Sequence, residues 1–268
     1  MNLQASPLHA RFCPDQAVQL PAVIVENVRL ARDTFRVRLH APEIARRIVP
    51  GQFVMARIAG LNDPLIGRPL ALYDTVIGTD GQPAAIDLVY LVKGKLTTRL
   101  CGMQPGQLLD VWGPLGNGFG AEGSGAGDQG AEGGVQGSGI RVQGPEIGAR
   151  TSDAGEGVPR SIHHRLAAVG LRGKRLHAAR QHLILVAGGI GQTPFLALAQ
   201  EALHLKRYGE PPREVPRAER ITFCYGARTA DYLAGVEDFE RLGIDVRIAT
   251  DDGSRGHPGL VTELLEQV

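Results

Sequence analysis

The sequence predicts two domains, a small antiparallel β-barrel and then a doubly wound parallel α/β sheet. Three observations lead to this prediction. Short segments of strand character fill residues 18–113, strands and helices alternate after residue 181, and an apolar run at residues 183–187 ends abruptly in glycines. With 268 residues and 43% hydrophobic content, the chain is long enough for two cores.

The barrel domain is expected over residues 18–119. Its six strands are expected at residues 22–30, 34–39, 52–58, 69–76, 85–92 and 107–112, with turns such as Pro50-Gly51 and Asp80-Gly81 between them. Two helices are expected among them, one at residues 42–48 and one that begins near Lys95. Closure into a barrel would remove the exposed edges of such short strands.

Residues 120–180 differ in composition from both sides. Twelve of the forty residues from 121 to 160 are glycine, and large apolar groups are rare. Such a stretch buries too little surface to offset its ordering entropy, so we expect a disordered insertion. The basic segment at residues 163–180 could form a short helix, but a solvated segment is the better interpretation.

Residues 181–268 are expected to form the second domain. Strands at 183–187, 220–225 and 245–250 alternate with helices at 194–208, 234–242 and 259–267, which is the pattern of a parallel sheet. The printed sequence supplies fewer strands than such sheets usually have, so the domain is expected to be incomplete and truncated, with the strand at 183–187 at an open edge.

The glycines after the first of these strands indicate a phosphate site. Gly188, Gly189, Ile190 and Gly191 would let the backbone approach an anion at the start of the following helix. Thr193 is expected as the N-cap of that helix and Pro194 as its first residue. The glycines could instead form a tight corner without a ligand. This alternative stays open because their spacing is not GxGxxG.

Charge and cysteine content exclude several classes of protein. A net charge of +1 gives no general attraction for nucleic acid or an anionic membrane, and no stretch is long enough to span a bilayer. Residues 1–12 contain no continuous apolar run of the kind found in a signal peptide, so a cytoplasmic location is expected. Cys13, Cys101 and Cys224 are too far apart for a disulfide framework or a metal site.

Residues 68–73, with the sequence RPLALY, resemble the flavin-binding strand of the ferredoxin reductase superfamily. PGQF at 50–53, GKLT at 94–97, WGPLGNGF at 112–119 and TDDGS at 250–254 are similar to further segments of that superfamily. The resemblance implies a flavin phosphate on Arg68 and flavin contacts along three segments. The residues expected to bind FAD are Arg68, Pro69, Leu70, Ala71, Val89, Tyr90, Leu91, Gly94, Leu96 and Thr97.

RPLAL, GPLGNGF and GGIGQTP together most resemble the electron-transfer subunits of NAD-dependent dihydroorotate dehydrogenase. This resemblance implies FAD, NAD(H) and a partner, the FMN-containing catalytic subunit, in pyrimidine biosynthesis. Electrons from dihydroorotate would pass through an iron–sulfur relay to FAD, which reduces NAD+ by hydride transfer, so no catalytic side chain is implied. The residues expected to bind NAD are Gly188, Gly189, Ile190, Gly191, Thr193, Pro194 and Arg228.

Three features depart from the family pattern. Ala71 stands where a Ser or Thr usually bonds near flavin N5, and Leu91 stands where an Arg is common, with Lys93 and Lys95 nearby instead. The four cysteines that hold a [2Fe-2S] cluster in relatives have no counterpart in this sequence.

Several alternatives stay open at this stage. Arg68 could form a salt bridge on the barrel rim, and Thr97 could cap a helix as well as bind phosphate. Tyr90 is expected in the core, whereas Tyr73 could lie in the core or touch the flavin. Arg228 and its neighbour Asp231 leave NAD and NADP undecided, and the resemblance favours NAD.

Two other functions compete with the electron-transfer subunit. One is a stand-alone NAD(P)H-dependent flavin or ferredoxin reductase, which the missing cysteines would allow. The other is a non-catalytic, truncated fragment or binding subunit, which Ala71 and Leu91 would favour.

Overall fold

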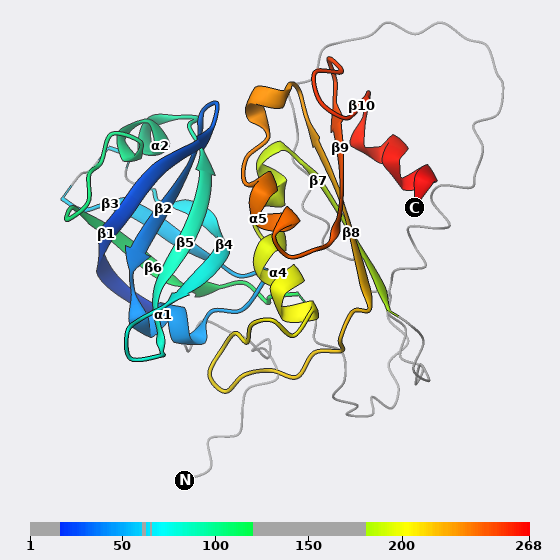
Figure 1. The fold of residues 1–268 in the computed structure, drawn as a ribbon. Coiled ribbons are helices and arrows are strands. Elements are labelled where there is room, and N and C mark those ends of the chain that lie inside the picture. The colour runs from blue at the N-terminus through cyan, green and yellow to red at the C-terminus, as the bar shows by residue number, and fades with distance from the viewer. Residues whose placement is uncertain (1–16, 61–62, 65, 120–180) are drawn as a thin grey trace, which may run out of the picture. The chain divides into compact units, whose positions relative to one another are not determined.

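The computed structural model describes residues 17–60, 63–64, 66–119 and 181–268. These residues lie in one compact unit that contains a closed barrel and a separate parallel sheet (Figure 1). The insertion predicted at residues 120–180 lies outside the described residues, as does Cys13. None of the helices in the described part is long and apolar enough to cross a membrane.

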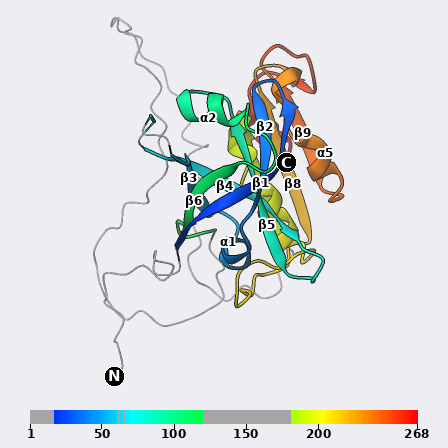
Figure 2. The ribbon, with the colours of Figure 1, turned by 90° about the vertical axis from the view of Figure 1, so that its left-hand side faces the viewer.

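The barrel is antiparallel and six-stranded, as predicted, with strand order β1-β2-β5-β4-β3-β6. Helices α1 (Pro42–Arg47) and α2 (Lys95–Leu100) lie at its opposite ends (Figure 2). All six strands overlap the predicted segments. Their bounds are β1 (Val18–Ala31), β2 (Thr34–His40), β3 (Phe53–Ile58), β4 (Arg68–Ile77), β5 (Pro83–Leu91) and β6 (Leu108–Leu115).

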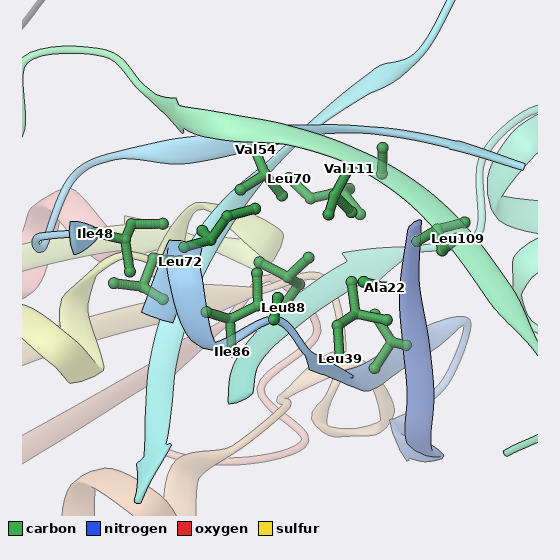
Figure 3. Packing of buried hydrophobic residues seen from close by; sticks show 14 of the residues in the cluster. Ala22, Leu39, Ile48, Val54, Leu70, Leu72, Ile86, Leu88, Leu109 and Val111 are labelled. Carbon is green, nitrogen blue, oxygen red and sulfur yellow. The ribbon is translucent and has the colours of Figure 1, made fainter. Parts of the chain in front are cut away.

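Alternate residues of these strands fill the barrel. Leu70 and Leu72 of β4 point inward, as do Leu109 and Val111 of β6, and Figure 3 shows them meeting the side chains of the other strands. This spacing of two is the pattern from which the strands were predicted. The barrel interior is therefore a packed hydrophobic core.

The second sheet is parallel, with the order β10-β9-β8-β7. Its strands are β7 (His182–Gly188), β8 (Arg220–Ala227), β9 (Asp245–Thr250) and the short β10 (His257–Pro258), which was not predicted. The helical segments are η3 (Gly189–Gln192), α4 (Phe195–Ala202), η4 (Ala230–Tyr232), α5 (Val236–Glu240) and η5 (Val261–Gln267).

The helices are shorter than predicted. The helix expected at 194–208 ends at Ala202, because His204 takes a left-handed conformation with φ of 59°. The helix expected at 234–242 lies between Gly235 and Gly243, which both have positive φ. Apolar periodicity indicated where these helices lie but not where the backbone leaves helical geometry.

Both faces of the parallel sheet are covered. Phe223 and Tyr225 of β8 pack in the cluster that includes residues of α4 and α5, whereas Cys224 packs with Leu264 of η5 (Figure 1). In the part of the chain that the structure describes, β7 pairs with β8 alone and forms one edge of the sheet.

Candidate cofactor-binding site

The ladder between β4 and β5 opens at the residues expected to bind FAD. The two strands pair from Ile77 with Pro83 to Leu72 with Leu88. Beyond that point β4 pairs with β3 over residues 68–71, while β5 pairs with β2 over residues 89–91. The facing backbone groups of these two segments are therefore outside the β4–β5 ladder, and they can bond a ligand placed between the strands.

Arg68 lies at the start of this opening. Its side chain is exposed, and it forms no ion pair with any described residue. The alternative of a salt bridge on the barrel rim therefore has no support among those residues. A free guanidinium at the edge of the opening fits a phosphate, which it can bind through two parallel hydrogen bonds.

The turn before α2 lies just beyond β5. Gly94 has φ of 110° and is exposed, and a Cβ there would meet no atom within 4 Å. The hydroxyl of Thr97 donates to the Gly94 carbonyl and accepts from the amide of Lys93 at 2.8 Å. Thr97 therefore holds the turn closed, and Lys95 is paired with Asp63 at 3.0 Å. The side chain of Leu96 is buried in the core, so only its backbone can reach a ligand.

Two tyrosines near the opening are core residues. The hydroxyl of Tyr90 donates to Asn27 at 3.0 Å, and its ring stacks on Phe35, so only its backbone can line the opening. Tyr73 is buried in the cluster of the parallel sheet, and its hydroxyl donates to Asp238 at 2.5 Å. Burial raises the pKa of both phenols above their usual range.

The glycines after β7 have space around them. A Cβ added to Gly188, Gly189 or Gly191 would meet no heavy atom within 4 Å, whereas a Cβ on Gly226 would lie 2.6 Å from the Cβ of Val261. Close packing therefore explains Gly226 but not the glycines of the turn. Of these three, only Gly189 has a positive φ, of 52°. The open space fits a ligand that approaches the backbone.

The expected helix cap at Thr193 is wrong. Thr193 has helical angles, φ −52° and ψ −42°, and the residue that precedes α4 as its N-cap is Pro194. The helical backbone already begins with η3 at Gly189, so Thr193 lies inside it and cannot take the extended conformation of a cap. Ile190, also expected to bind NAD, lies within η3 and is exposed.

Gln192 is a candidate that the sequence did not reveal. Its side chain is fully buried at the end of η3, and neither its amide nitrogen nor its amide oxygen has a hydrogen-bond partner in the described part of the chain. A buried amide without partners is destabilising, so this side chain can still form hydrogen bonds with a bound group. The sequence does not show that this glutamine is buried without a partner, so it was not singled out.

The strands of the parallel sheet end at one edge, where Gly188 lies beside Gly226 and Ala227 lies beside Thr250. Arg228 follows β8 at this edge and is exposed. The segment after β8 bonds to the loop after β9, because the amide of Ala230 donates to the Ser254 hydroxyl at 2.8 Å. The sequence placed Arg228 here through the pattern of parallel strands.

The barrel contributes to the same region. A cavity of about 360 Å³ is lined by Asp231 and the β1–β2 turn, which brings Arg29 and Arg32 beside it. The amide of Arg32 donates to the Asp231 carbonyl at 2.8 Å. These arginines were missed because only the fold brings the turn to the loop after β8.

The two candidate regions are neighbours. The segment η3, which contains the glycine turn, lies next to β5, and α4 lies next to β4. The opening in the barrel and the glycine turn of the sheet thus lie on elements that contact each other.

Comparison with known proteins agrees with this architecture. Residues 21–119 match the family of oxidoreductase FAD-binding domains. Solved structures with the same fold include an NADH-dependent reduced ferredoxin-NADP oxidoreductase, 24% identical, with a TM-score of 0.57 over 92% of this chain and 63% of that one. An Amycolatopsis cytochrome P450 reductase, 18% identical, also has a TM-score of 0.57, over 99% of this chain and 61% of that one.

The barrel therefore matches the oxidoreductase FAD-binding domains, and the chain has the barrel-plus-sheet fold of ferredoxin reductases. In sequence it is similar to dihydroorotate dehydrogenase B (NAD(+)) electron transfer subunits. The subunit of Desulforamulus reducens is 27% identical over 246 residues, 92% of this chain and 67% of that protein. A homolog from Thermotoga maritima is 27% identical, over 91% of this chain and 60% of that protein. The chain spans about two thirds of the length of these relatives.

Proposed function

We propose that this chain is a FAD-dependent oxidoreductase that passes electrons between NAD(H) and a redox partner. The observation that carries the proposal is that the glycine turn of η3 lies next to β5, whose end forms one side of the opening in the barrel. Such an arrangement lets one site hold a flavin and a nicotinamide side by side. When bound, FAD supplies the redox chemistry itself.

The residues of the barrel would bind and orient FAD. The Arg68 guanidinium would hold the phosphate, and the backbone groups of residues 68–71 and 89–91 that lie outside the β4–β5 ladder would bond the ring. The turn at Gly94 would bring its amide and the charge of Lys93 toward the same phosphate. Ala71 has no hydroxyl, so any bond to flavin N5 from this strand must come from the backbone.

The residues of the sheet would bind NAD(H). The backbone at Gly188, Gly189 and Gly191 would accept the pyrophosphate, since no side chain or neighbour fills that space. The adenosine would lie over the ends of β8 and β9, near Arg228 and Asp231. The names of the relatives support NAD over NADP.

We further propose that the partner is the catalytic, FMN-containing subunit of a dihydroorotate dehydrogenase. The names of the sequence relatives support this assignment, since each is an electron-transfer subunit or its homolog. A four-cysteine [2Fe-2S] site needs more thiolates than the three cysteines of this sequence supply. A stand-alone reductase with the same fold is the second candidate function.

A flavin absorbance spectrum tests these proposals. We expect the purified chain to carry FAD and to lose its flavin absorbance when NADH is added without oxygen. Flavin reduction by dihydroorotate that requires an added catalytic subunit would support the electron-transfer subunit. Flavin reduction by NADH that neither dihydroorotate nor the catalytic subunit changes would support the stand-alone reductase. A chain that binds FAD but is not reduced by NADH would contradict both.

A further inference from the structure

The flavin strand β4 carries an irregularity just after the residues proposed to line the flavin. Leu72 pairs with Leu88 and Asp74 pairs with Asp87, so Tyr73 is an extra residue with no partner in β5. In a regular strand the side chains of Tyr73 and Asp74 would point to opposite faces of the sheet. A bulge changes this alternation and redirects a side chain.

As a result, both side chains reach the parallel-sheet part of the chain. Tyr73 donates to Asp238 of α5 at 2.5 Å, and its ring packs in the cluster that contains Leu185 and Ala187 of β7. Asp74 turns toward α4 and the segment that follows it. One bulge therefore connects the flavin strand to both helices on that face of the sheet.

Asp74 is bonded by three side chains of that part. Lys206 donates to its Oδ1 at 2.5 Å, the Tyr208 hydroxyl donates to the same oxygen at 2.8 Å, and the Gln200 amide donates to Oδ2 at 3.1 Å. Lys206 also donates to the backbone carbonyl of Thr75. Burial is the main reason that the pKa of Tyr208 lies above its usual range, so this hydroxyl stays protonated and remains a donor.

These contacts connect the two halves of the proposed site by short stretches of backbone. Asp74 is three residues from Ala71 at the opening of the barrel, and α4 begins at Phe195, four residues after Gly191 of the glycine turn. The elements α4 and β4 lie against each other. A shift of β4 against α4 would therefore move the flavin segment against the nucleotide segment.

We propose that the contacts of Asp74 with Lys206, Tyr208 and Gln200, together with the Tyr73–Asp238 bond, form a clamp that sets the position of the flavin strand relative to the nucleotide turn. This inference rests on the proposed function, because the clamp acts on electron transfer between FAD and NAD(H). Its members are positioning residues and do not contact the reacting atoms. Two groups held in the right geometry react far faster than loosely held ones, and a displacement of about 1 Å can slow a reaction about a hundredfold.

The test is Asp74→Asn in the full chain, with Asp110→Asn as the matched control. Asp74 is 21% exposed and bonds to Lys206, while Asp110 is 22% exposed and bonds to Arg57 at 3.2 Å within the barrel. Both variants remove one half-buried carboxylate charge, but only the first affects the clamp. In Asp74→Asn, the bonds of Arg213 to Glu201 and to the Phe119 carbonyl still connect the barrel to α4.

The measurements are FAD content, affinity for ADP-ribose, the rate of flavin reduction in one turnover with NADH, and the long-wavelength absorbance that reports stacking of flavin and nicotinamide. In Asp74→Asn we expect FAD content and ADP-ribose affinity to stay the same, the stacking absorbance to fall, and reduction to slow by about 10- to 100-fold. Asp110→Asn should match the wild type. A wild-type rate and absorbance in Asp74→Asn would overturn the clamp.

Tyr208→Phe keeps the test decisive if Asp74→Asn loses FAD or does not fold. It removes one donor and leaves the carboxylate bonded to Lys206, so we expect a smaller slowing, of about threefold or more. An unchanged rate in this variant would overturn the proposal in that case.

Hydrogen exchange separates the failure of the clamp from the failure of the proposed function. If the wild type is not reduced by NADH, the proposed function is wrong, but the clamp still predicts faster exchange in both β4 and α4 of Asp74→Asn and not of Asp110→Asn. Unchanged exchange in both elements would show that no clamp exists, whatever the chain binds.

Discussion

The glycine turn after β7 offers a substitution that separates ligand binding from folding. Gly191 has a negative φ, and a Cβ added there would meet no heavy atom of the described residues within 4 Å. Gly191→Ala should therefore leave the free energy of unfolding within about 0.5 kcal/mol of the wild type. Gly189 is a poorer choice, because its φ of 52° would add backbone strain to the steric effect.

The same methyl group would occupy the space proposed for the NAD(H) pyrophosphate. Loss of a hydrogen bond between the backbone and a charged phosphate costs about 1.5–3 kcal/mol, which corresponds to about 10- to 100-fold weaker binding. The assay is calorimetric titration of the FAD-loaded protein with NADH and with ADP-ribose, and both affinities should fall. An unchanged affinity for both ligands would refute the assignment of the glycine turn.

Gly226→Ala is the control on the neighbouring strand. Its Cβ would lie 2.6 Å from the Cβ of Val261, so overpacking should destabilise the fold by about 1–3 kcal/mol. Val261 lies in η5, which packs with Cys224 of the same strand. NADH affinity measured below the unfolding transition should therefore change little. Gly191→Ala should thus weaken NADH binding and leave the free energy of unfolding nearly unchanged. Gly226→Ala should lower the free energy of unfolding and leave NADH binding nearly unchanged.

Three further outcomes are expected. Arg68→Ala should weaken FAD binding about 10- to 100-fold, and full FAD retention through gel filtration would contradict the phosphate assignment. Gln192→Met, which removes a buried amide without partners in the described chain, should raise the free energy of unfolding by about 1–3 kcal/mol and so raise the thermal midpoint; a lower midpoint would count against it. Cys224 should resist iodoacetamide until the chain unfolds, because burial raises its pKa, while the half-buried Cys101 reacts earlier; equal rates would contradict this.

The elements that were predicted correctly are those with a local signal. The β-rich sequence of β4 and the turn at Asp80-Gly81 identified a strand and its end, and the apolar run before Gly188 identified β7. The helix ends were missed, since a left-handed residue such as His204 leaves no mark in the apolar pattern. The short β10 was missed because two residues are too few for a periodic signal.

The site could be predicted only where its residues carry a motif. The segments at 68–71 and 188–191 were predicted because the RPLAL strand carries a resemblance and the glycines follow an apolar run. The bulge at Tyr73 and the bond between Asp74 and Lys206, 132 residues apart, depend on how the barrel packs against α4. No pattern within one segment contains that information, so the contacts that couple the two halves were invisible in the sequence.

The open edge of the parallel sheet leads to one more prediction. In the described part of the chain β7 pairs with β8 alone, and Ile184 on β7 is 43% exposed. An apolar strand with free backbone groups along one side can pair with another chain. We therefore expect the protein to form oligomers as its concentration rises in sedimentation experiments. The amides of β7 should exchange faster than those of β8, which is paired on both sides.

Ile184→Lys tests whether this edge is the contact. A lysine on an edge strand blocks pairing between strands, so the variant should sediment as a monomer while NADH affinity, which depends on the glycine turn beyond the end of the strand, stays the same. Ile77→Lys is the matched control, because Ile77 is 49% exposed on β4, which is paired with β5, and it should associate like the wild type. A wild type that stays monomeric with slowly exchanging β7 amides would contradict the open edge.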